Sequence, residues 1–146
     1  MMPNEATILL VEDNQDDIDL TLRAFQKSKI ANRIVVARDG QEALDYLFAA
    51  GANLSLDPDA MPHVVLLDLK LPKVSGLDVL RALRADEHTR RLPVVILTSS
   101  KHERDLVESY DRGANSYVVK PIEYAELIGT LGDLTRYWLA INEPAL

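Results

Sequence analysis

The residues best suited to chemistry each stand directly after a short apolar run. Glu12 and Asp13 follow TILLV, Asp68 follows VVLL, Thr98 follows VVIL and Lys120 follows YVV. Three neighbouring carboxylates repel one another unless a cation lies between them, and oxygen ligands suit a hard ion such as Mg²⁺. A lysine partly neutralises an anion, and a threonine hydroxyl donates to an incoming oxygen. These are the parts needed for phosphoryl transfer to a carboxylate, with Asp68 as the nucleophile.

These side chains meet only if the apolar runs are neighbouring strands of one sheet. The sequence predicts five strands, at Thr7–Val11, Arg33–Ala37, Val64–Leu67, Val94–Leu97 and Tyr117–Val119. At least the first, third and fourth are almost entirely apolar, as in parallel strands covered on both faces. Helical patterns separate them, so the chain is expected to be α/β, a doubly wound parallel sheet of five strands with five helices. Ligands of such sheets bind beyond the carboxyl ends of the strands.

Four helix starts are marked by a capping residue with an acid three places later. The pairs are Asn14 with Asp17, Asp39 with Glu42, Ser75 with Asp78, and Ser100 with Glu103, of which only the last is a strict capping box. The stretch from Gly51 to Pro62 is predicted to be a long loop into the third strand. Residues 1–146 are expected to form a single domain, with a core at about 6–139 and a tail at 140–146.

Composition narrows the range of functions. The formal net charge is −7, which disfavours non-specific binding to nucleic acids and to anionic membranes. The absence of cysteine excludes disulfides and thiolate metal sites. No segment has the length of a membrane span, and the first residues lack the pattern of a signal peptide. A soluble, cytoplasmic domain is therefore expected.

With these residues at these positions, the chain resembles a CheY-like receiver domain of two-component signalling, from Ile8 to about Trp138. The resemblance is carried by LLVEDN, LLDLKLPKVSG, VVILTSS and GANSYVVKPI, in that order. Thirty residues separate Asp68 from Thr98, and twenty-two separate Thr98 from Lys120, which also fits. The resemblance implies the flavodoxin-like topology of receivers.

The resemblance also implies a role for each matching residue. Asp68 is the phosphoacceptor, and Lys120 binds the phosphoryl oxygens and precedes a cis peptide at Pro121. Thr98 moves to hold the phosphoryl group, and Tyr117 follows it inward, so these two residues form the switch. The implied cofactor is Mg²⁺, with Asp13, Asp68 and the backbone carbonyl of Lys70 as direct ligands and Glu12 acting through water.

The family further implies a partner and a mode of action. The phosphoryl donor is a sensor histidine kinase or a phosphotransfer protein, and the receiver is a regulator rather than an enzyme, apart from its own phosphorylation and dephosphorylation. No output domain follows Trp138 in the sequence, which predicts a stand-alone regulator. The Gly51–Pro62 insertion, the run YDRGANSY and the terminal YWL resemble regulators paired with bacteriophytochrome-type kinases.

A homodimer is expected through the fourth helix, fifth strand and fifth helix. The positions Leu127, Leu131, Leu134, Trp138 and Ile141 follow steps of 4, 3, 4 and 3, which places them on one helical stripe. The aromatic end of this stripe lies past the expected edge of the sheet. Exposed apolar surface there favours a self-complementary contact.

Three other functions compete with the receiver. A flavodoxin-type cofactor binder needs a phosphate-cradling loop after the first strand, where this chain has the acidic residues 12–17. A haloacid-dehalogenase-type phosphatase needs a second aspartate two residues after the nucleophile, where this chain has Lys70. A degenerate receiver that acts only as an interaction module is disfavoured because every phosphorylation residue is present.

Overall fold

The described residues form one parallel sheet of five strands, as expected from the alternating strands and helices. The structure is a computed structural model that describes residues 6–29, 32–57 and 59–145. Its strands are β1 (Thr7–Val11), β2 (Arg33–Ala37), β3 (Val64–Leu67), β4 (Val94–Thr98) and β5 (Ser116–Val119). They lie in the order β2-β1-β3-β4-β5, and every neighbouring pair is parallel. The first three strands have the predicted bounds, and β4 and β5 are each one residue longer.

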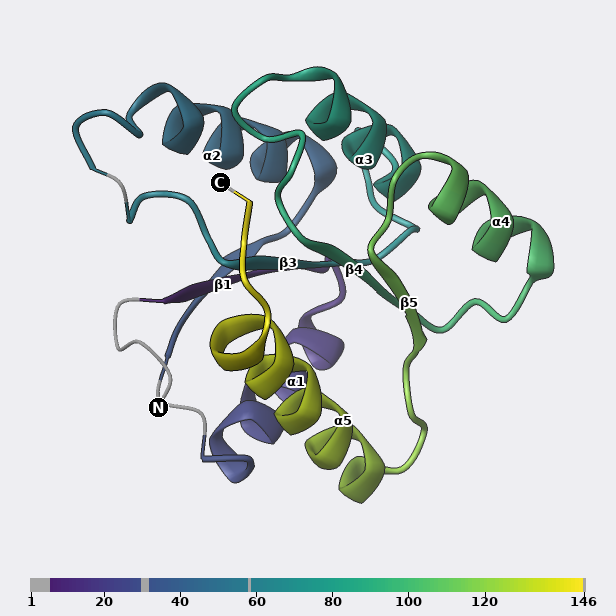
Figure 1. The fold of residues 1–146 in the computed structure, drawn as a ribbon. Helices are drawn as coiled ribbons and strands as arrows, with labels where there is room; N and C mark the ends of the chain where they lie inside the picture. The colour runs from purple at the N-terminus through teal and green to yellow at the C-terminus, as the bar shows by residue number, and fades with distance from the viewer. Residues whose placement is uncertain (1–5, 30–31, 58, 146) are drawn as a thin grey trace.

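The helices cover both faces of the sheet (Figure 1). They are α1 (Gln15–Lys27), α2 (Gly40–Ala52), α3 (Gly76–Ala85), α4 (Glu103–Asp111) and α5 (Tyr124–Arg136), followed by the π-helical turn η1 (Tyr137–Ile141). In Figure 1, α2 and α3 lie on one side of the sheet, and α1 and α5 lie on the other. The doubly wound α/β fold predicted from the sequence is therefore confirmed.

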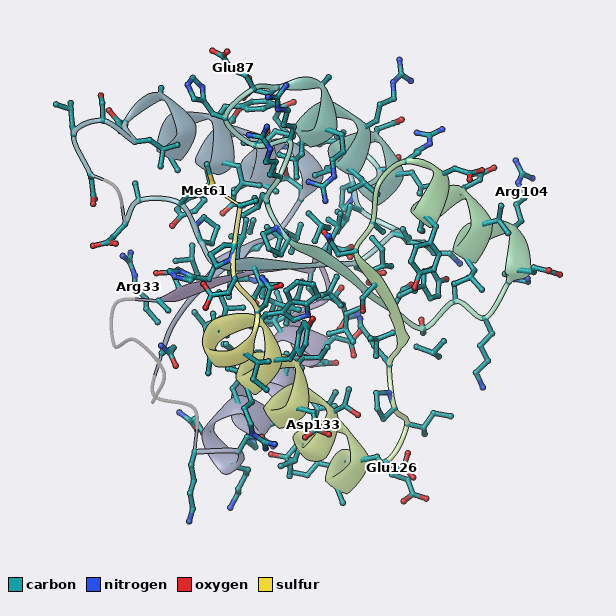
Figure 2. The ribbon with its side chains drawn as sticks, viewed as in Figure 1. Arg33, Met61, Glu87, Arg104, Glu126 and Asp133 are labelled. Carbon is teal, nitrogen blue, oxygen red and sulfur yellow. The ribbon has the colours of Figure 1, made fainter. Side chains whose placement is uncertain are left out.

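Alternate residues of each strand supply the two cores. Leu9, Val65 and Ile96 pack with side chains of α2 and α3, while Leu10, Leu66 and Val95 pack with side chains of α1 and α5. All six are at most 3% exposed. Burial on both faces explains why β1, β3 and β4 carry no alternating polar positions. Charged residues such as Arg104 and Glu126 point outward from the helices instead (Figure 2).

Two of the expected connections differ from the structure. The predicted loop from Gly51 to Pro62 begins later, because α2 continues through Ala52, and Gly51 is buried against His88 and Met61. The fourth helix begins at Glu103, and its N-cap residue is His102 rather than Ser100. The other three predicted caps are confirmed, since Asn14, Asp39 and Ser75 each accept the amide hydrogen predicted from the spacing.

The end of the last helix also departs from the expected stripe. In η1 the amide nitrogen of Asn142 donates to the carbonyl oxygen of Tyr137 at 2.7 Å, a step of five residues. This wider turn rotates the helix face, so that Leu139 is 5% exposed whereas Ile141 is 60% exposed. Trp138 packs partly against the core beneath α1 and α5. The stripe therefore does not continue unbroken to Ile141.

Candidate functional site

The site lies at the carboxyl edge of the sheet, where strand register brings distant residues together. Val11 pairs with Leu67, and the amide nitrogen of Asp68 donates to the carbonyl oxygen of Val11 at 3.1 Å. The ladder between β4 and β5 continues in the same way, because the amide nitrogen of Lys120 donates to the carbonyl oxygen of Thr98 at 2.7 Å. The carboxyl ends of these four strands therefore bring Glu12, Asp68, Thr98 and Lys120 to one edge of the sheet, as predicted.

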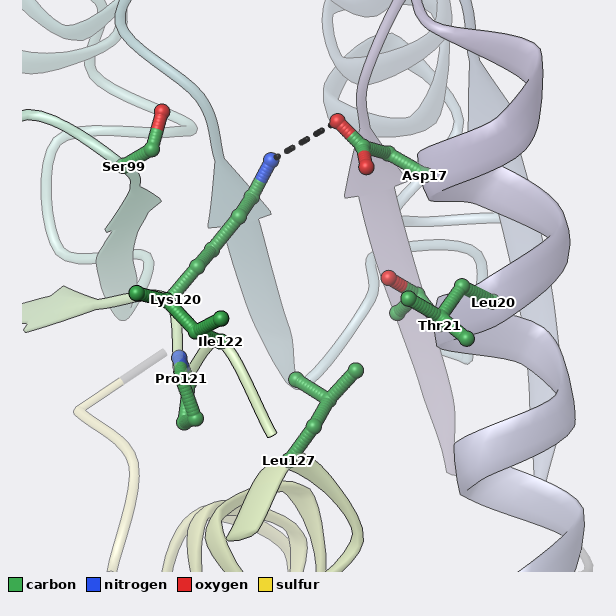
Figure 3. Close-up of a pocket in the computed structure, with 8 residues that line it drawn as sticks. All are labelled: Asp17, Leu20, Thr21, Ser99, Lys120, Pro121, Ile122 and Leu127. Atoms are coloured by element: carbon green, nitrogen blue, oxygen red, sulfur yellow. Dashed lines mark ion pairs between the residues drawn. The ribbon is translucent and has the colours of Figure 1, made fainter. Parts of the chain in front are cut away.

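The ammonium group of Lys120 joins the carboxylates of this edge. Its Nζ forms a hydrogen-bonded ion pair with Glu12 Oε1 and lies 3.3 Å from Asp68 Oδ2. A longer ion pair of 3.8 Å joins Nζ to Asp17 Oδ2 at the start of α1, as Figure 3 shows. One cation thus neutralises part of the charge of three carboxylates that come from separate segments of the chain.

Burial and the contact between them shift the pKa values of Glu12 and Lys120. Glu12 is 3% exposed, and its burial raises the pKa of the carboxyl above the ordinary value, although the hydrogen bond from Lys120 opposes this shift. Burial acts to lower the pKa of Lys120, but the Glu12 hydrogen bond and the charges of Asp68, Glu12 and Asp17 outweigh it, so the pKa is raised. Lys120 therefore remains charged at neutral pH.

Asp68 is held by its own loop. Its Oδ1 accepts a hydrogen bond from the amide nitrogen of Leu69 at 2.7 Å, while Oδ2 faces Lys120. The start of α3 packs closely against the backbone of Asp68. A Cβ atom on Gly76 would lie only 2.2 Å from the carbonyl oxygen of Asp68. Glycine is needed there for close approach, which explains the Ser75-Gly76 step after the acceptor loop.

Thr98 and Tyr117 both form a hydrogen bond with the backbone of Ser100. Thr98 is 2% exposed, and its Oγ1 accepts a hydrogen bond from the amide nitrogen of Ser100 at 3.3 Å. The Tyr117 hydroxyl donates to the carbonyl oxygen of Ser100 at 3.0 Å. Both predicted switch residues therefore contact the backbone of Ser100, a residue that the sequence pattern had assigned to a helix cap.

The predicted metal ligands are only partly gathered. Asp68 and Glu12 lie on either side of the Lys120 ammonium, whereas Asp13 and Lys70 are exposed. Among the residues that the structure describes, no group of three or more His, Cys, Asp or Glu side chains is arranged to hold a metal ion. Lys120 supplies positive charge beside both the buried Glu12 and the partly buried Asp68. The donor set still has the hard oxygen chemistry that suits Mg²⁺.

One implied backbone feature is wrong. No peptide bond within the described ranges is cis, so the bond between Lys120 and Pro121 is trans. The trans form is the ordinary preference even before proline. Lys120 reaches both Glu12 and Asp68 from this trans backbone, so its contacts do not require the cis form.

A pocket opens beside the site, between α1 and the segment that follows β5 (Figure 3). Its volume is about 340 Å³, and Lys120 and Asp17 lie at its polar end. Leu20, Thr21, Pro121, Ile122 and Leu127 supply most of the remaining wall. The sequence pattern had identified Asp17 only as a helix-cap partner, and its contact with Lys120 depends on how α1, which packs against α5, lies relative to the segment that follows β5. In the part of the chain that the structure describes, no helix has the length and apolarity needed to cross a membrane.

The family is now defined by both sequence and fold. Residues 8–131 match the family model of the response regulator receiver domain. The chain therefore belongs to the response regulator receiver domain family, whose members are regulators of two-component signalling that are phosphorylated on an aspartate. Membership implies a histidine kinase or a phosphotransfer protein as partner.

Solved relatives are similar over nearly the whole chain. The bacteriophytochrome response regulator AtBRR is 52% identical, with a TM-score of 0.73, and the match covers 97% of this chain and 100% of that one. The phosphorylated cyanobacterial phytochrome response regulator RcpA is 35% identical, with a TM-score of 0.83 and coverage of 97% and 99%. The resemblance to phytochrome response regulators, predicted from the insertion and the terminal aromatic run, is thereby confirmed.

A third relative has been solved with a metal. Response regulator Rcp1 of Synechocystis sp. is 33% identical over 139 residues, which is 94% of this chain and 92% of that one. The structure of its Mn²⁺-bound form superimposes on this chain with a TM-score of 0.81, at 31% identity and coverage of 97% and 99%.

Proposed function

We propose that Asp68 is the aspartate that accepts the phosphoryl group from a sensor histidine kinase or phosphotransfer protein. The observation that carries this proposal is the position of Lys120 Nζ, 3.3 Å from Asp68 Oδ2 and paired with the buried Glu12. Lys120 balances the negative charge of the acceptor in the resting protein. The same ammonium is placed to receive the oxygens of an incoming phosphoryl group.

In the proposed transfer, the phosphoryl group leaves a nitrogen of the donor and joins an oxygen of Asp68. An oxygen of the Asp68 carboxylate attacks the phosphorus of a phosphohistidine, the new P–O bond forms and the P–N bond breaks. The electron pair of that bond returns to the imidazole nitrogen of the donor, which takes up a proton. Asp68 becomes an acyl phosphate, and Lys120 remains beside its oxygens. Later attack by water on phosphorus returns Asp68 to its carboxylate and releases inorganic phosphate.

A divalent cation, which we infer to be Mg²⁺, assists this step. Asp13, Asp68 and the backbone carbonyl of Lys70 would hold it directly, and Glu12 would act through water. Such an ion neutralises developing charge on the phosphoryl oxygens. The oxygen-only donor set supports this choice, as does the Mn²⁺-bound form of Rcp1.

Thr98 and Tyr117 form the conformational switch in this proposal. The hydroxyl of Thr98 donates to a phosphoryl oxygen on Asp68, and Tyr117 responds to the movement of the β4–α4 segment. Their shared contact with the backbone of Ser100 supports a coupled response. A hydrogen bond that exists only with the phosphoryl group present biases one of the two conformations.

The proposed setting is the cytoplasm, as a single receiver domain of residues 1–146. The similarity to the phytochrome response regulators AtBRR and RcpA favours a phytochrome-type kinase as the donor. We also propose a homodimer through α4, β5 and α5. Exposed apolar side chains on and beside these elements support it, namely Val107, Tyr110, Val119, Ile122 and Tyr137.

Asp68→Asn is the test of the acceptor. We expect the variant to fold but to lose phosphate incorporation from acetyl phosphate with Mg²⁺, because the amide lacks the nucleophilic charge. Intact-protein mass spectrometry measures the added phosphate. Asp86→Asn serves as a control, because Asp86 lies away from this edge, at the end of α3. Undiminished incorporation in Asp68→Asn would refute the assignment.

A further inference from the structure

Ser100 links three parts of the switch region through separate atoms. Its amide nitrogen donates to Thr98 Oγ1 at 3.3 Å, and its carbonyl oxygen accepts from the Tyr117 hydroxyl at 3.0 Å. Its own hydroxyl donates to Asp105 Oδ2 at 2.5 Å and accepts from the amide nitrogen of His102 at 3.3 Å. The backbone of one residue therefore contacts both switch side chains, while its side chain contacts the first turn of α4.

The contact with Asp105 is strong for a single hydrogen bond. Ser100 is 9% exposed, and a hydroxyl–carboxylate distance of 2.5 Å is typical of a charge-assisted bond. Asp105 in turn is fixed within α4, because Ser109 Oγ donates to its carbonyl oxygen at 2.7 Å. The Ser100 side chain is therefore bonded directly to the first turn of α4.

The rest of α4 is weakly attached. Ser109 is its one fully buried residue, and Leu106, Val107 and Tyr110 are between 37% and 50% exposed. The N-cap residue His102 provides no side-chain hydrogen bond to the helix. A helix with little buried surface is free to move at low cost, so a few polar contacts decide its position.

We propose that Ser100 is a positioning residue that couples the Thr98 and Tyr117 switch to α4 through its hydrogen bond with Asp105. This inference rests on the proposed function of Asp68 and Thr98. We expect the bond from the Ser100 amide to lengthen or break when the Thr98 side chain rotates and moves Oγ1 toward a phosphoryl group on Asp68. The β4–α4 segment then moves, and Ser100 carries α4 with it through Asp105.

The test compares Ser100→Ala with Ser100→Thr and the wild-type protein. Alanine keeps the two backbone contacts and removes only the hydroxyl, whereas threonine restores a hydroxyl. Phosphate uptake from acetyl phosphate is measured by mass, and the amide resonances of residues 103–111 are followed by NMR with beryllofluoride and Mg²⁺. We expect Ser100→Ala to take up phosphate as the wild-type protein does. The equilibrium between the resting and the responding positions of α4 should shift toward the resting position by about tenfold, the factor expected for one hydrogen bond to a charged group.

A second pair of variants removes the partner instead. Asp105→Ala should reproduce the loss of α4 response, while Glu103→Ala removes the same charge from the same turn without breaking a bond to Ser100. Recovery of the α4 response in Ser100→Thr would show that the hydroxyl couples the switch to α4 and that the loss in Ser100→Ala is not merely structural. If Ser100→Ala is unstable, Asp105→Ala still tests the contact.

The outcomes distinguish this inference from the proposed function. A wild-type protein that takes up no phosphate on Asp68 would contradict the proposed function itself. Normal phosphate uptake, with the α4 response of Ser100→Ala and Asp105→Ala equal to that of Glu103→Ala, would overturn only the coupling role. Loss of response in Ser100→Ala and Asp105→Ala, with rescue by threonine, would support it.

Discussion

Lys120 Nζ lies 3.3 Å from Asp68 Oδ2, although fifty-two positions separate the two residues in the chain. Lys120 also pairs with Glu12, which is almost completely buried. The ammonium therefore has two roles at the carboxyl edge of the sheet. It neutralises a buried carboxylate, and it places positive charge beside the proposed phosphoacceptor.

Replacing this charge should slow phosphorylation of Asp68. In Lys120→Met we expect phosphate uptake from acetyl phosphate to fall about a hundredfold, because a donor aimed at the phosphoryl oxygens is lost. The buried Glu12 would then be protonated more readily, which limits the loss of stability. The rate is measured by mass spectrometry, with the exposed Lys101→Met as control. Equal rates in Lys120→Met and wild type would argue against the role of Lys120.

The metal assignment predicts a specific effect of Asp13. Asp13→Asn removes a directly ligating charge, so Mg²⁺ affinity should fall by at least the roughly tenfold that loss of an outer-sphere partner costs. Isothermal titration measures the affinity. Asp16→Asn is the matched control, because Asp16 is an exposed aspartate three positions away. Unchanged binding by Asp13→Asn, or an equal loss in both variants, would contradict the assignment.

The switch assignment is tested at Thr98. In Thr98→Ala we expect phosphate uptake to continue while the response of Tyr117 to phosphorylation is lost, because the hydroxyl supplies the bond that favours one conformation. NMR of the Tyr117 ring, with and without beryllofluoride, measures the response. Thr135→Ala is the control, because Thr135 is equally buried but lies on α5. A normal Tyr117 response in Thr98→Ala would be evidence against the switch.

Asp39 should make stability depend on pH. The hydrogen bond from the Glu42 amide, together with nearby Lys73, holds the pKa of Asp39 below its ordinary value. Because the folded pKa is the lower one, the charge stabilises the fold above the unfolded pKa, and this contribution is lost as the pH falls through the folded pKa. Asparagine also caps helices well, so Asp39→Asn removes mainly the charge.

The measurement is thermal unfolding of wild type and Asp39→Asn between about pH 2 and pH 7. We expect wild type to melt at the higher temperature near neutrality and the two curves to converge at the acidic end. A difference between the two proteins that stays constant down to the lowest pH would count against this explanation.

The proposed dimer is testable by sedimentation of phosphorylated and unphosphorylated protein over a concentration series. Val107→Glu should weaken the dimer, because Val107 is 49% exposed on α4. Leu56→Glu should not, although Leu56 is 84% exposed, because it lies in the turn region after α2. Tests at Trp138 are less suitable, since this side chain packs partly against the core. Strictly monomeric protein in both forms would exclude the dimer.

The sequence by itself determined the sheet and the residues at its carboxyl edge. Continuous apolar strands such as Val64–Leu67 require cover on both faces, and this requirement leads to parallel strands joined by helices. Once the strands are parallel, Asp68 and Lys120 must lie at the same edge of the sheet, because each follows the carboxyl end of its strand. Caps such as Asn14 were predictable because the bond spans only three residues.

Only the tertiary structure decided the contacts between side chains from different elements. The pairing of Asp17 with Lys120 depends on the packing of α1 against α5 and on the course of the chain after β5, and local spacing contains no information about it. Ser100 had the spacing of a helix cap. In the structure its hydroxyl instead donates a hydrogen bond to Asp105, and its backbone forms hydrogen bonds with Thr98 and Tyr117. The π-helical turn that buries Leu139 is likewise a result of packing, because it changes the helical repeat on which the predicted stripe depended.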